Sequence, residues 1–191
     1  MKCDIVLAGV GGQGILTIAA LVGKVAMIRG LNVKQSEVHG MAQRGGSVLA
    51  HLRLSDAPIH SDLIADGTAD VVLGMEPMEA LRHGPSLGEG GVIIANANPV
   101  VNIGDYPELE KVHAAIKSFP RHVLVDGESL AKEAGSTRSV NMVLLGTLAS
   151  FLPLPTELFA QAITETFARK GEEIVAMNLK AYEAGRQAAA N

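Results

Sequence analysis

One segment decides the fold: Gly9-Val10-Gly11-Gly12-Gln13-Gly14. It follows the apolar run Ile5–Ala8, which predicts a buried strand, and it precedes an apolar stretch from Ile15 to about Arg29, which predicts a helix that stops at Gly30. A strand, a glycine-rich turn and a helix in this order are typical of the first unit of a nucleotide-binding α/β sheet. Glycines allow a tight turn, and they let backbone amides approach an anion at the positive end of the helix.

Strand-like and helix-like segments alternate along the rest of the chain. Strands are expected at 31–38, 47–54, 69–73, 91–95 and 122–125, and helices at 76–82, 108–117, 128–134, 141–152, 155–169 and 172–187. Such alternation favours a parallel sheet that is covered on both faces. We therefore expect a three-layer α/β fold with a mostly parallel sheet, helices on both faces and a helical C-terminal third. Residues 1–191 are expected to form a single domain, because no linker, repeat or low-complexity tract interrupts them.

Composition excludes several classes of protein. The 191 residues are 48% hydrophobic and 19% charged, which suits a sizeable core and not a disordered chain. A net charge of −4 without a basic run gives no electrostatic reason to bind nucleic acid, and 3% aromatic residues leave no stacking platform for bases. The apolar run Ile15–Ile28 contains Lys24 and is shorter than the ~20 residues of a membrane-spanning helix. No contact with a membrane is expected.

Residues that could carry chemistry on their own are scarce. The single cysteine, Cys3, excludes an internal disulfide and an iron–sulfur cluster held by this chain alone, because such clusters need about four thiolate ligands. It also favours a reduced, cytoplasmic setting. The histidines form no i, i+4 pair on an expected helix, so no metal site is predicted. No Gly-x-Ser-x-Gly turn and no Gly-Asp-Gly with a later asparagine occur, so we predict no catalytic residue and no thiamine diphosphate–magnesium site here.

The glycine segment is the first candidate for binding a ligand. Its candidate anion-binding residues are Gly9, Gly11, Gly12, Gln13 and Gly14. A P-loop is excluded, because Ile15-Leu16 follows where Lys and Ser/Thr would be needed. A dinucleotide site also needs an acidic residue at the end of the second strand, and only Glu37 is available there, rather late. The alternative is that these glycines only let the first helix pack tightly on the first strand.

A second candidate follows the expected second strand. Its polar and glycine residues are His39, Gln43, Arg44, Gly45 and Gly46. We expect this segment to lie beside the glycine loop at the carboxyl edge of the sheet. Arginine is the side chain best suited to a planar carboxylate or a phosphate. The alternative is a solvated loop whose arginine pairs with a nearby carboxylate.

Further blocks accompany these two segments. They are His39-Gly40-Met41-Ala42-Gln43-Arg44-Gly45-Gly46-Ser47, Ala69-Asp70-Val71, Glu76-Pro77-Met78-Glu79-Ala80-Leu81-Arg82, Asp126…Leu130-Ala131, Asn141-Met142-Val143-Leu144-Leu145-Gly146 and Asn178…Ala181…Gly185. Together they resemble the gamma-type domain of 2-oxoacid:ferredoxin oxidoreductases, over essentially the whole chain. The His-Gly-x-x-Gln-Arg-Gly-Gly form is most similar to the small, beta subunit of the indolepyruvate enzymes.

This resemblance implies a two-subunit enzyme. In that family the large (alpha) subunit carries thiamine diphosphate, magnesium and the iron–sulfur clusters, and the complex decarboxylates an aryl-2-oxoacid with CoA to an aryl-acetyl-CoA and reduces ferredoxin. The present chain would carry no cofactor, be inactive alone, and complete the active site or the approach of CoA. Part of its apolar C-terminal third is expected to contact the large subunit.

Other functions stay open on the sequence alone. A gamma subunit of a related pyruvate or 2-oxoglutarate enzyme would share the Arg44-Gly45-Gly46 turn. A stand-alone Rossmann-like nucleotide-binding protein would use the glycine loop by itself. A purely structural assembly subunit would use neither segment for ligands.

Overall fold

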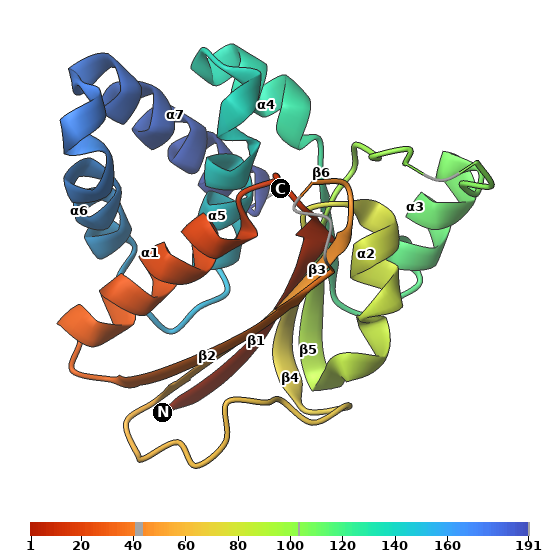
Figure 1. Ribbon diagram of the computed structural model, residues 1–191, viewed down its shortest axis with the longest axis horizontal. Coiled ribbons are helices and arrows are strands. Elements are labelled where there is room, and N and C mark those ends of the chain that lie inside the picture. The colour runs from red at the N-terminus through yellow and green to blue at the C-terminus, as the bar shows by residue number, and fades with distance from the viewer. Residues whose placement is uncertain (41–43, 103, 191) are drawn as a thin grey trace.

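The computed structural model describes residues 1–40, 44–102 and 104–190. Within these ranges the strands are β1 (Lys2–Val10), β2 (Asn32–His39), β3 (Ser47–Ser55), β4 (Ala69–Gly74), β5 (Leu87–Asn96) and β6 (His122–Val125). They form one sheet in the order β2-β3-β1-β4-β5-β6. Figure 1 shows this sheet with its strands labelled. The pairs β1–β4, β4–β5 and β5–β6 are parallel, whereas β3 is antiparallel to both β1 and β2. The predicted mostly parallel sheet is confirmed.

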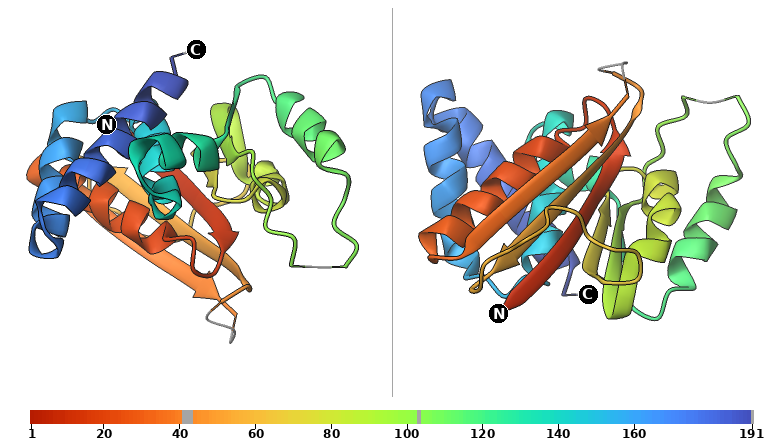
Figure 2. Two further views of the ribbon diagram at one scale, coloured as in Figure 1. Left: turned by 90° about the horizontal axis from the view of Figure 1, so that it is seen from above. Right: turned by 60° about the horizontal axis from the view of Figure 1, so that its bottom comes forward.

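Helices cover both faces of this sheet. They are α1 (Ile15–Ile28), α2 (Pro77–Arg82), α3 (Leu109–Lys117), α4 (Gly127–Ala134), α5 (Val140–Ala149), α6 (Thr156–Phe167) and α7 (Glu172–Ala188). Figures 1 and 2 show α1 and α4 to α7 on one face and α2 with α3 on the other. The three-layer α/β fold and the helical C-terminal third are therefore confirmed. None of the helices in the described ranges is long and apolar enough to cross a bilayer.

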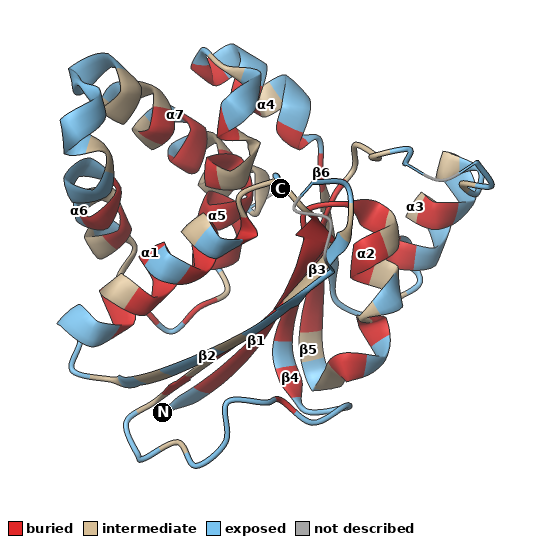
Figure 3. Ribbon diagram, viewed as in Figure 1, coloured by how far each residue is buried: buried red, intermediate tan, exposed pale blue. Residues whose placement is uncertain are grey.

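Each face of the sheet has its own apolar core. Along β1 the side chains alternate, so that Ile5 and Leu7 join the larger core beneath α1 and α5 while Val6 joins the smaller core beneath α2 and α3. The central strands are consequently buried on both sides, as Figure 3 shows for β1, β4 and β5. This explains why 5–8, 71–73 and 92–95, in β1, β4 and β5, are continuous apolar runs rather than alternating ones.

The C-terminal helices use their apolar residues inside the chain. A Cβ on Gly146 of α5 would lie 1.9 Å from the carbonyl oxygen of Tyr182, and one on Gly185 of α7 would lie 1.8 Å from that of Val143. Thr147 Oγ1 completes this close helix contact by donating to the carbonyl of Gly185 at 3.0 Å. The exposed large apolar residues of the described chain are Met1, Leu16, Met27, Ile28, Val38, Leu63 and Val101. None of these lies in the C-terminal third, where Phe151, Leu158, Phe167 and Leu179 are only partly buried, and the expected contact of this part with another chain stays a prediction.

The chain reverses its winding between β1 and β4. After β1 it crosses to the face that carries α1, and after β4 it crosses to the face that carries α2 (Figure 1). In open α/β sheets, ligands bind in the crevice at the carboxyl ends of the strands beside such a reversal. The fold therefore points to the region around the end of β1.

Candidate functional site

The two glycine segments lie side by side at this carboxyl edge. The N–H of Gly11 donates to the carbonyl of Gly46 at 2.8 Å, and the N–H of Gly45 donates to the carbonyl of Gly11 at 3.3 Å. The register of the sheet also brings the end of β2 close to the end of β1. His39 of β2 lies opposite Val48 of β3, and Val48 lies opposite Gly9 of β1. The expected proximity of the two segments is confirmed.

Individual glycines of the first loop have different roles. A Cβ on Gly9 would lie within 2.9 Å of Gln13, Met75 and Ile15, so this glycine serves close packing. Gly12 has a φ of 101°, and a Cβ added there would meet nothing within 4 Å. Gly14 has a φ of 83° at the start of α1. These two positions need the left-handed backbone that glycine adopts without strain. The loop therefore combines a tightly packed glycine, Gly9, with one whose surroundings are open, Gly12.

Gln13 fixes the turn from within. Its Oε1 accepts the N–H of Val10 at 2.7 Å, and its Nε2 donates to the carbonyl of Met75 at 3.1 Å. The oxygen of the side-chain amide is therefore hydrogen-bonded to the backbone of β1, and its nitrogen to the backbone of the segment after β4. The ligand contact that the sequence suggested for Gln13 stays a prediction, while its observed contacts tie the loop to the neighbouring strand.

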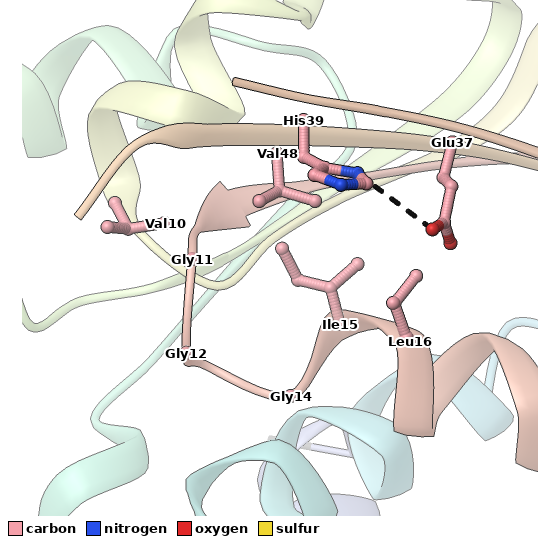
Figure 4. A pocket seen from close by; sticks show the side chains of 9 residues that line it. All are labelled: Val10, Gly11, Gly12, Gly14, Ile15, Leu16, Glu37, His39 and Val48. Atoms are coloured by element: carbon pink, nitrogen blue, oxygen red, sulfur yellow. Dashed lines mark ion pairs between the residues drawn. The ribbon is translucent and has the colours of Figure 1, made fainter. Parts of the chain in front are cut away.

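A cavity of about 490 Å³ opens between this loop and β2 (Figure 4). It is lined by Val10, Gly11, Gly12, Gly14, Ile15, Leu16, Glu37, His39 and Val48. Its floor is the first turn of α1, which begins at Gly14 without a side-chain cap and without an acidic residue. The first N–H groups of a helix carry partial positive charge, so this end of the cavity favours an anion or a hydrogen-bond acceptor.

The opposite wall carries His39 and Glu37. His39 Nδ1 lies 3.9 Å from Glu37 Oε1, a contact that becomes an ion pair when the imidazole is protonated, and Figure 4 shows both side chains facing the start of α1. Glu37, which lies later in the sequence than the acidic residue of a dinucleotide site, therefore does line the glycine-loop cavity. A carboxylate accepts hydrogen bonds and repels anions, so the two ends of the cavity suit opposite ends of a polar ligand.

Arg44 extends from the turn between β2 and β3. It is exposed, and its guanidinium has no ion pair or hydrogen bond to the rest of the described chain, so the paired, solvated arginine of the alternative hypothesis is not seen there. Gly45 has a φ of 79°, which fits the tight turn that follows. Gln43 lies outside the described residues. Gly45 and Gly46 are bonded to Gly11 of the loop, whereas Arg44 does not line the cavity of His39.

A pair of buried carboxylates was not anticipated from the sequence. Glu76 is 2% exposed and Glu79 is 6% exposed, just beyond β4. Glu79 accepts from Ser47 Oγ at 2.5 Å, and Glu76 caps α2 by accepting the N–H of Glu79 at 2.9 Å. The sequence carried part of the signal, because Pro77 is favoured at the first position of a helix and so places Glu76 at the N-cap.

Glu76 also holds the chain that follows β5 against the site. Glu76 accepts a hydrogen bond from the Tyr106 hydroxyl and another from the N–H of Val100 at 3.4 Å. Asn102 Nδ2 then donates to the carbonyl of Gly45 at 2.7 Å. Burial, and the hydrogen bond to Glu76, raise the pKa of Tyr106, so its hydroxyl stays a donor. Residues 98–102 and 104–106, here called the strap, thereby link Glu76 to the second glycine segment.

Cysteine and metal chemistry find little support in the geometry. Cys3 is buried in β1, and burial together with Asp70 and Asp4 raises the pKa of its thiol to about 12. A thiol with such a pKa stays protonated at neutral pH and is a poor nucleophile and metal ligand. Within the described part of the chain, no three His, Cys, Asp or Glu side chains come together as a possible metal site.

These features define a class: an α/β protein whose mostly parallel sheet brings two glycine segments together at its carboxyl edge. The chain belongs to the pyruvate ferredoxin/flavodoxin oxidoreductase family, whose model matches residues 4–188. It is 39% identical to the indolepyruvate oxidoreductase subunit IorB of Archaeoglobus fulgidus, over 97% of this chain and 94% of that one.

Two solved structures share the fold. The pyruvate oxidoreductase subunit PORC of Thermotoga maritima superposes with a TM-score of 0.76 at 21% identity, covering 97% of this chain and 96% of that one. The 2-oxoglutarate:ferredoxin oxidoreductase of Magnetococcus marinus, with 2-oxoglutarate, coenzyme A and succinyl-CoA bound, superposes with a TM-score of 0.79 at 23% identity. That match covers 99% of this chain but 31% of the other, so the present fold corresponds to one part of a longer chain.

Proposed function

We propose that this chain is the small subunit of an indolepyruvate, or arylpyruvate, ferredoxin oxidoreductase. The complex would oxidatively decarboxylate an aryl-2-oxoacid and form an aryl-acetyl-CoA, with ferredoxin as electron acceptor, in the cytoplasm. The observation that carries this proposal is the similarity to the Archaeoglobus IorB subunit across nearly the full length of both chains. A gamma subunit acting on pyruvate or 2-oxoglutarate is the alternative within the same family.

The chemistry is divided between two subunits in this proposal. Thiamine diphosphate with magnesium would supply the electron sink for decarboxylation, and iron–sulfur clusters would carry electrons to ferredoxin, all on the large subunit. Two observations on this chain support that division. Cys3 is the single cysteine and lies buried in β1 with a raised thiol pKa, and the described residues bring no three His, Cys, Asp or Glu side chains together. The small subunit, as one gamma-type domain, would be inactive alone.

The role of this chain would be to bind and orient an anionic substrate. The first turn of α1 and the glycines 11, 12 and 14 offer backbone donors, and Arg44 offers at the rim a guanidinium that no described residue pairs. Both the carboxylate of a 2-oxoacid and the phosphates of CoA suit these donors. Glu37 and His39, on the far wall, would then meet a hydroxyl or N–H group of the same ligand.

Substrate choice is the direct test of the proposal. The complex, co-expressed with its large subunit and purified anaerobically, is assayed with CoA and a viologen dye on indolepyruvate, pyruvate and 2-oxoglutarate. The proposal predicts the highest kcat/KM for indolepyruvate. A higher kcat/KM for pyruvate or 2-oxoglutarate would reassign the chain to the alternative. No turnover of any 2-oxoacid by the complex would refute both.

A further inference from the structure

The buried carboxylates of Glu76 and Glu79 have no part in the function proposed above. Both lie at the start of α2, and this helix packs closely on the sheet, because a Cβ on Gly74 of β4 would lie 2.3 Å from the Cβ of Ala80. Burying a carboxylate is costly unless donors surround it. The donors that surround these two carboxylates therefore indicate what the pair does.

One donor connects Glu79 to the second glycine segment. Ser47 Oγ donates to Glu79 Oε2 at 2.5 Å, a length typical of a strong bond to an ionised oxygen. Ser47 directly follows Gly46 and is the first residue of β3. Arg82 Nη2 lies 3.6 Å from the other carboxylate oxygen of Glu79. The start of β3 is thus tied to α2 through a carboxylate that faces a positive charge.

The strap connects Glu76 to the same glycine segment by another route. Glu76 Oε1 accepts the N–H of Val100 at 3.4 Å, and the Tyr106 hydroxyl donates to the same oxygen. Two residues after Val100, Asn102 Nδ2 donates to the carbonyl of Gly45 at 2.7 Å. Gly45 is therefore held by the strap, and the strap is held by Glu76.

The two routes close into a ring. The N–H of Glu79 donates to Glu76 Oε2 at 2.9 Å, which joins the routes at α2. The consecutive residues Gly45, Gly46 and Ser47 join them at the other end. A cavity of about 220 Å³ is lined by members of the ring, namely Gly45, Ser47, Glu76, Glu79, Asn102 and Tyr106. No member of such a ring can move far unless one of its bonds breaks.

Arg44 is attached to this ring through its peptide bond to Gly45. On one side the turn is bonded to Gly11 of the first loop, and on the other side it is bonded to the ring. Loss of a ring bond would therefore free the turn on the side of α2 and the strap. A binding group is most effective when its position is set before the ligand arrives, because less conformational entropy is then lost.

We propose that Ser47 and Glu79, together with Glu76 and the strap, are positioning residues of the complex. They hold the turn at Gly45 so that the guanidinium of Arg44 meets an anionic substrate, and they act without touching that substrate themselves. A displaced binding group loses much of its effect, which is why such a group needs firm support. The inference rests on the proposed function for the identity of the substrate, CoA or indolepyruvate.

The test uses the complex with the large subunit, assayed as above with CoA and indolepyruvate varied in turn. Ser47→Ala removes one bond of the ring, so the KM of the substrate that depends on Arg44 should rise about threefold to tenfold. The kcat should stay within about twofold of the wild type, because a binding contact and no reacting group is disturbed. Ser47→Thr keeps the hydroxyl and should restore the KM. Adding Ser47→Ala to Arg44→Ala should raise the KM no further, because the hydroxyl acts through the arginine.

Two further measurements separate positioning from general damage. Hydrogen exchange at the Gly45 amide, followed by NMR in this chain alone, should be about tenfold faster in Ser47→Ala, because the turn opens more often. Ser118→Ala is the matched control, because Ser118 Oγ donates to the carbonyl of Ala115 at 2.6 Å at the end of α3, outside the ring. This control should change neither the KM values nor the exchange rate.

Several results would overturn the proposal. They are unchanged KM values in Ser47→Ala, unchanged hydrogen exchange in that variant, a Ser47→Thr complex as impaired as Ser47→Ala, and effects of Ser47→Ala and Arg44→Ala that add in full. The wild type reports separately on the proposed function. A wild-type complex that turns over no 2-oxoacid refutes that function, whereas one that turns over indolepyruvate while Ser47→Ala keeps the wild-type KM values contradicts this inference alone.

Discussion

The N–H of Gly11 donates to the carbonyl oxygen of Gly46 at 2.8 Å, and this bond joins two glycine segments that come from different strands. One segment ends β1 and opens α1, and the other ends the turn between β2 and β3. Asn102 of the strap joins the same point by donating to the carbonyl of Gly45. The candidate binding edge is therefore built from three separate parts of the chain, and a substitution in any of them should affect the geometry of the site.

Arg44→Ala should impair the assembled enzyme without unfolding it. The side chain is exposed and has no partner in the described chain, so thermal stability should not change. Losing a charge-assisted contact costs about 1.5–3 kcal/mol, so the apparent affinity for CoA or for indolepyruvate should fall roughly tenfold to hundredfold. Steady-state kinetics that vary each substrate separately identify which one is affected.

Arg169→Ala, at an exposed turn before α7, is the matched control and should behave like the wild type. If the constants for both substrates stay unchanged in Arg44→Ala, the arginine is not part of the substrate site. If Arg44→Ala fails to co-purify with the large subunit, the arginine belongs to the subunit interface.

Gly146→Ala should destabilise the chain strongly. The added Cβ would lie 1.9 Å from the carbonyl oxygen of Tyr182, so α5 and α7 would have to separate. Overpacking of this kind costs on the order of 3 kcal/mol in the free energy of unfolding. Urea unfolding of the purified variant measures this loss. Gly104→Ala is the control, because a Cβ there meets nothing within 4 Å, and a loss as large as that of Gly146→Ala would show that the helix contact is not the cause.

Tyr106→Phe should cost more stability than Tyr182→Phe. The Tyr106 hydroxyl donates to the buried carboxylate of Glu76, whereas the Tyr182 hydroxyl donates to the carbonyl of Thr156 at 3.1 Å. Hydrogen bonds to charged groups contribute about 1.5–3 kcal/mol, and neutral ones about 0.5–1.5 kcal/mol. Urea unfolding of both variants gives the comparison. Equal losses, or a larger loss for Tyr182→Phe, would show that the hydrogen bond from Tyr106 to Glu76 stabilises the fold no more than a neutral hydrogen bond does.

His51 should make the stability of the chain depend on pH. Its Nδ1 accepts the N–H of Ile64 at 2.9 Å, which requires the neutral ring, and burial lowers its pKa from 6.5 although nearby Asp66 acts in the opposite direction. A histidine whose pKa is lowered by folding contributes stability that is complete above its ordinary pKa and is lost as the pH falls.

His51→Gln removes this titration and keeps an acceptor for Ile64. The wild type should therefore lose more unfolding free energy than the variant between pH 7.5 and about pH 5. The neighbouring groups Asp62, Asp66, Arg53 and His83 are present in both proteins, so their titration largely cancels in the difference. Parallel pH profiles for the two proteins would contradict this role.

Much of the fold could be predicted from the sequence. The expected helix at 15–29 is α1 (Ile15–Ile28), and the last expected helix, 172–187, is α7 (Glu172–Ala188), because apolar spacing and glycine stops mark such elements locally. The helix expected at 141–152 ends earlier, at Ala149. Leu152 is buried all the same, which is why its apolar character suggested a longer helix.

The order of the strands could not be predicted. β3 pairs between β1 and β2, an arrangement set by the long-range register from Lys2 opposite Ser55 to Val10 opposite Ser47. A dinucleotide fold would place the second strand directly beside the first, so this insertion argues against the stand-alone Rossmann-like alternative. Local sequence patterns contain no information on such pairing.

The binding edge was predicted in part. Its two glycine segments were found from motif spacing, and their contact is confirmed by the bonds between Gly11 and Gly46. Glu76 and Glu79 were missed as site residues, because the side chains that donate to them, Tyr106 and Ser47, are distant in the sequence.

The central claim is that this chain works as one subunit of a 2-oxoacid oxidoreductase. The most direct measurement titrates the purified chain anaerobically into its large subunit and follows the indolepyruvate-dependent reduction of a viologen dye in the presence of CoA. We expect no turnover from this chain alone, little from the large subunit alone, and a rate that rises with added chain and saturates at a fixed stoichiometry. Turnover by this chain alone, or an undiminished rate from the large subunit without it, would contradict the account.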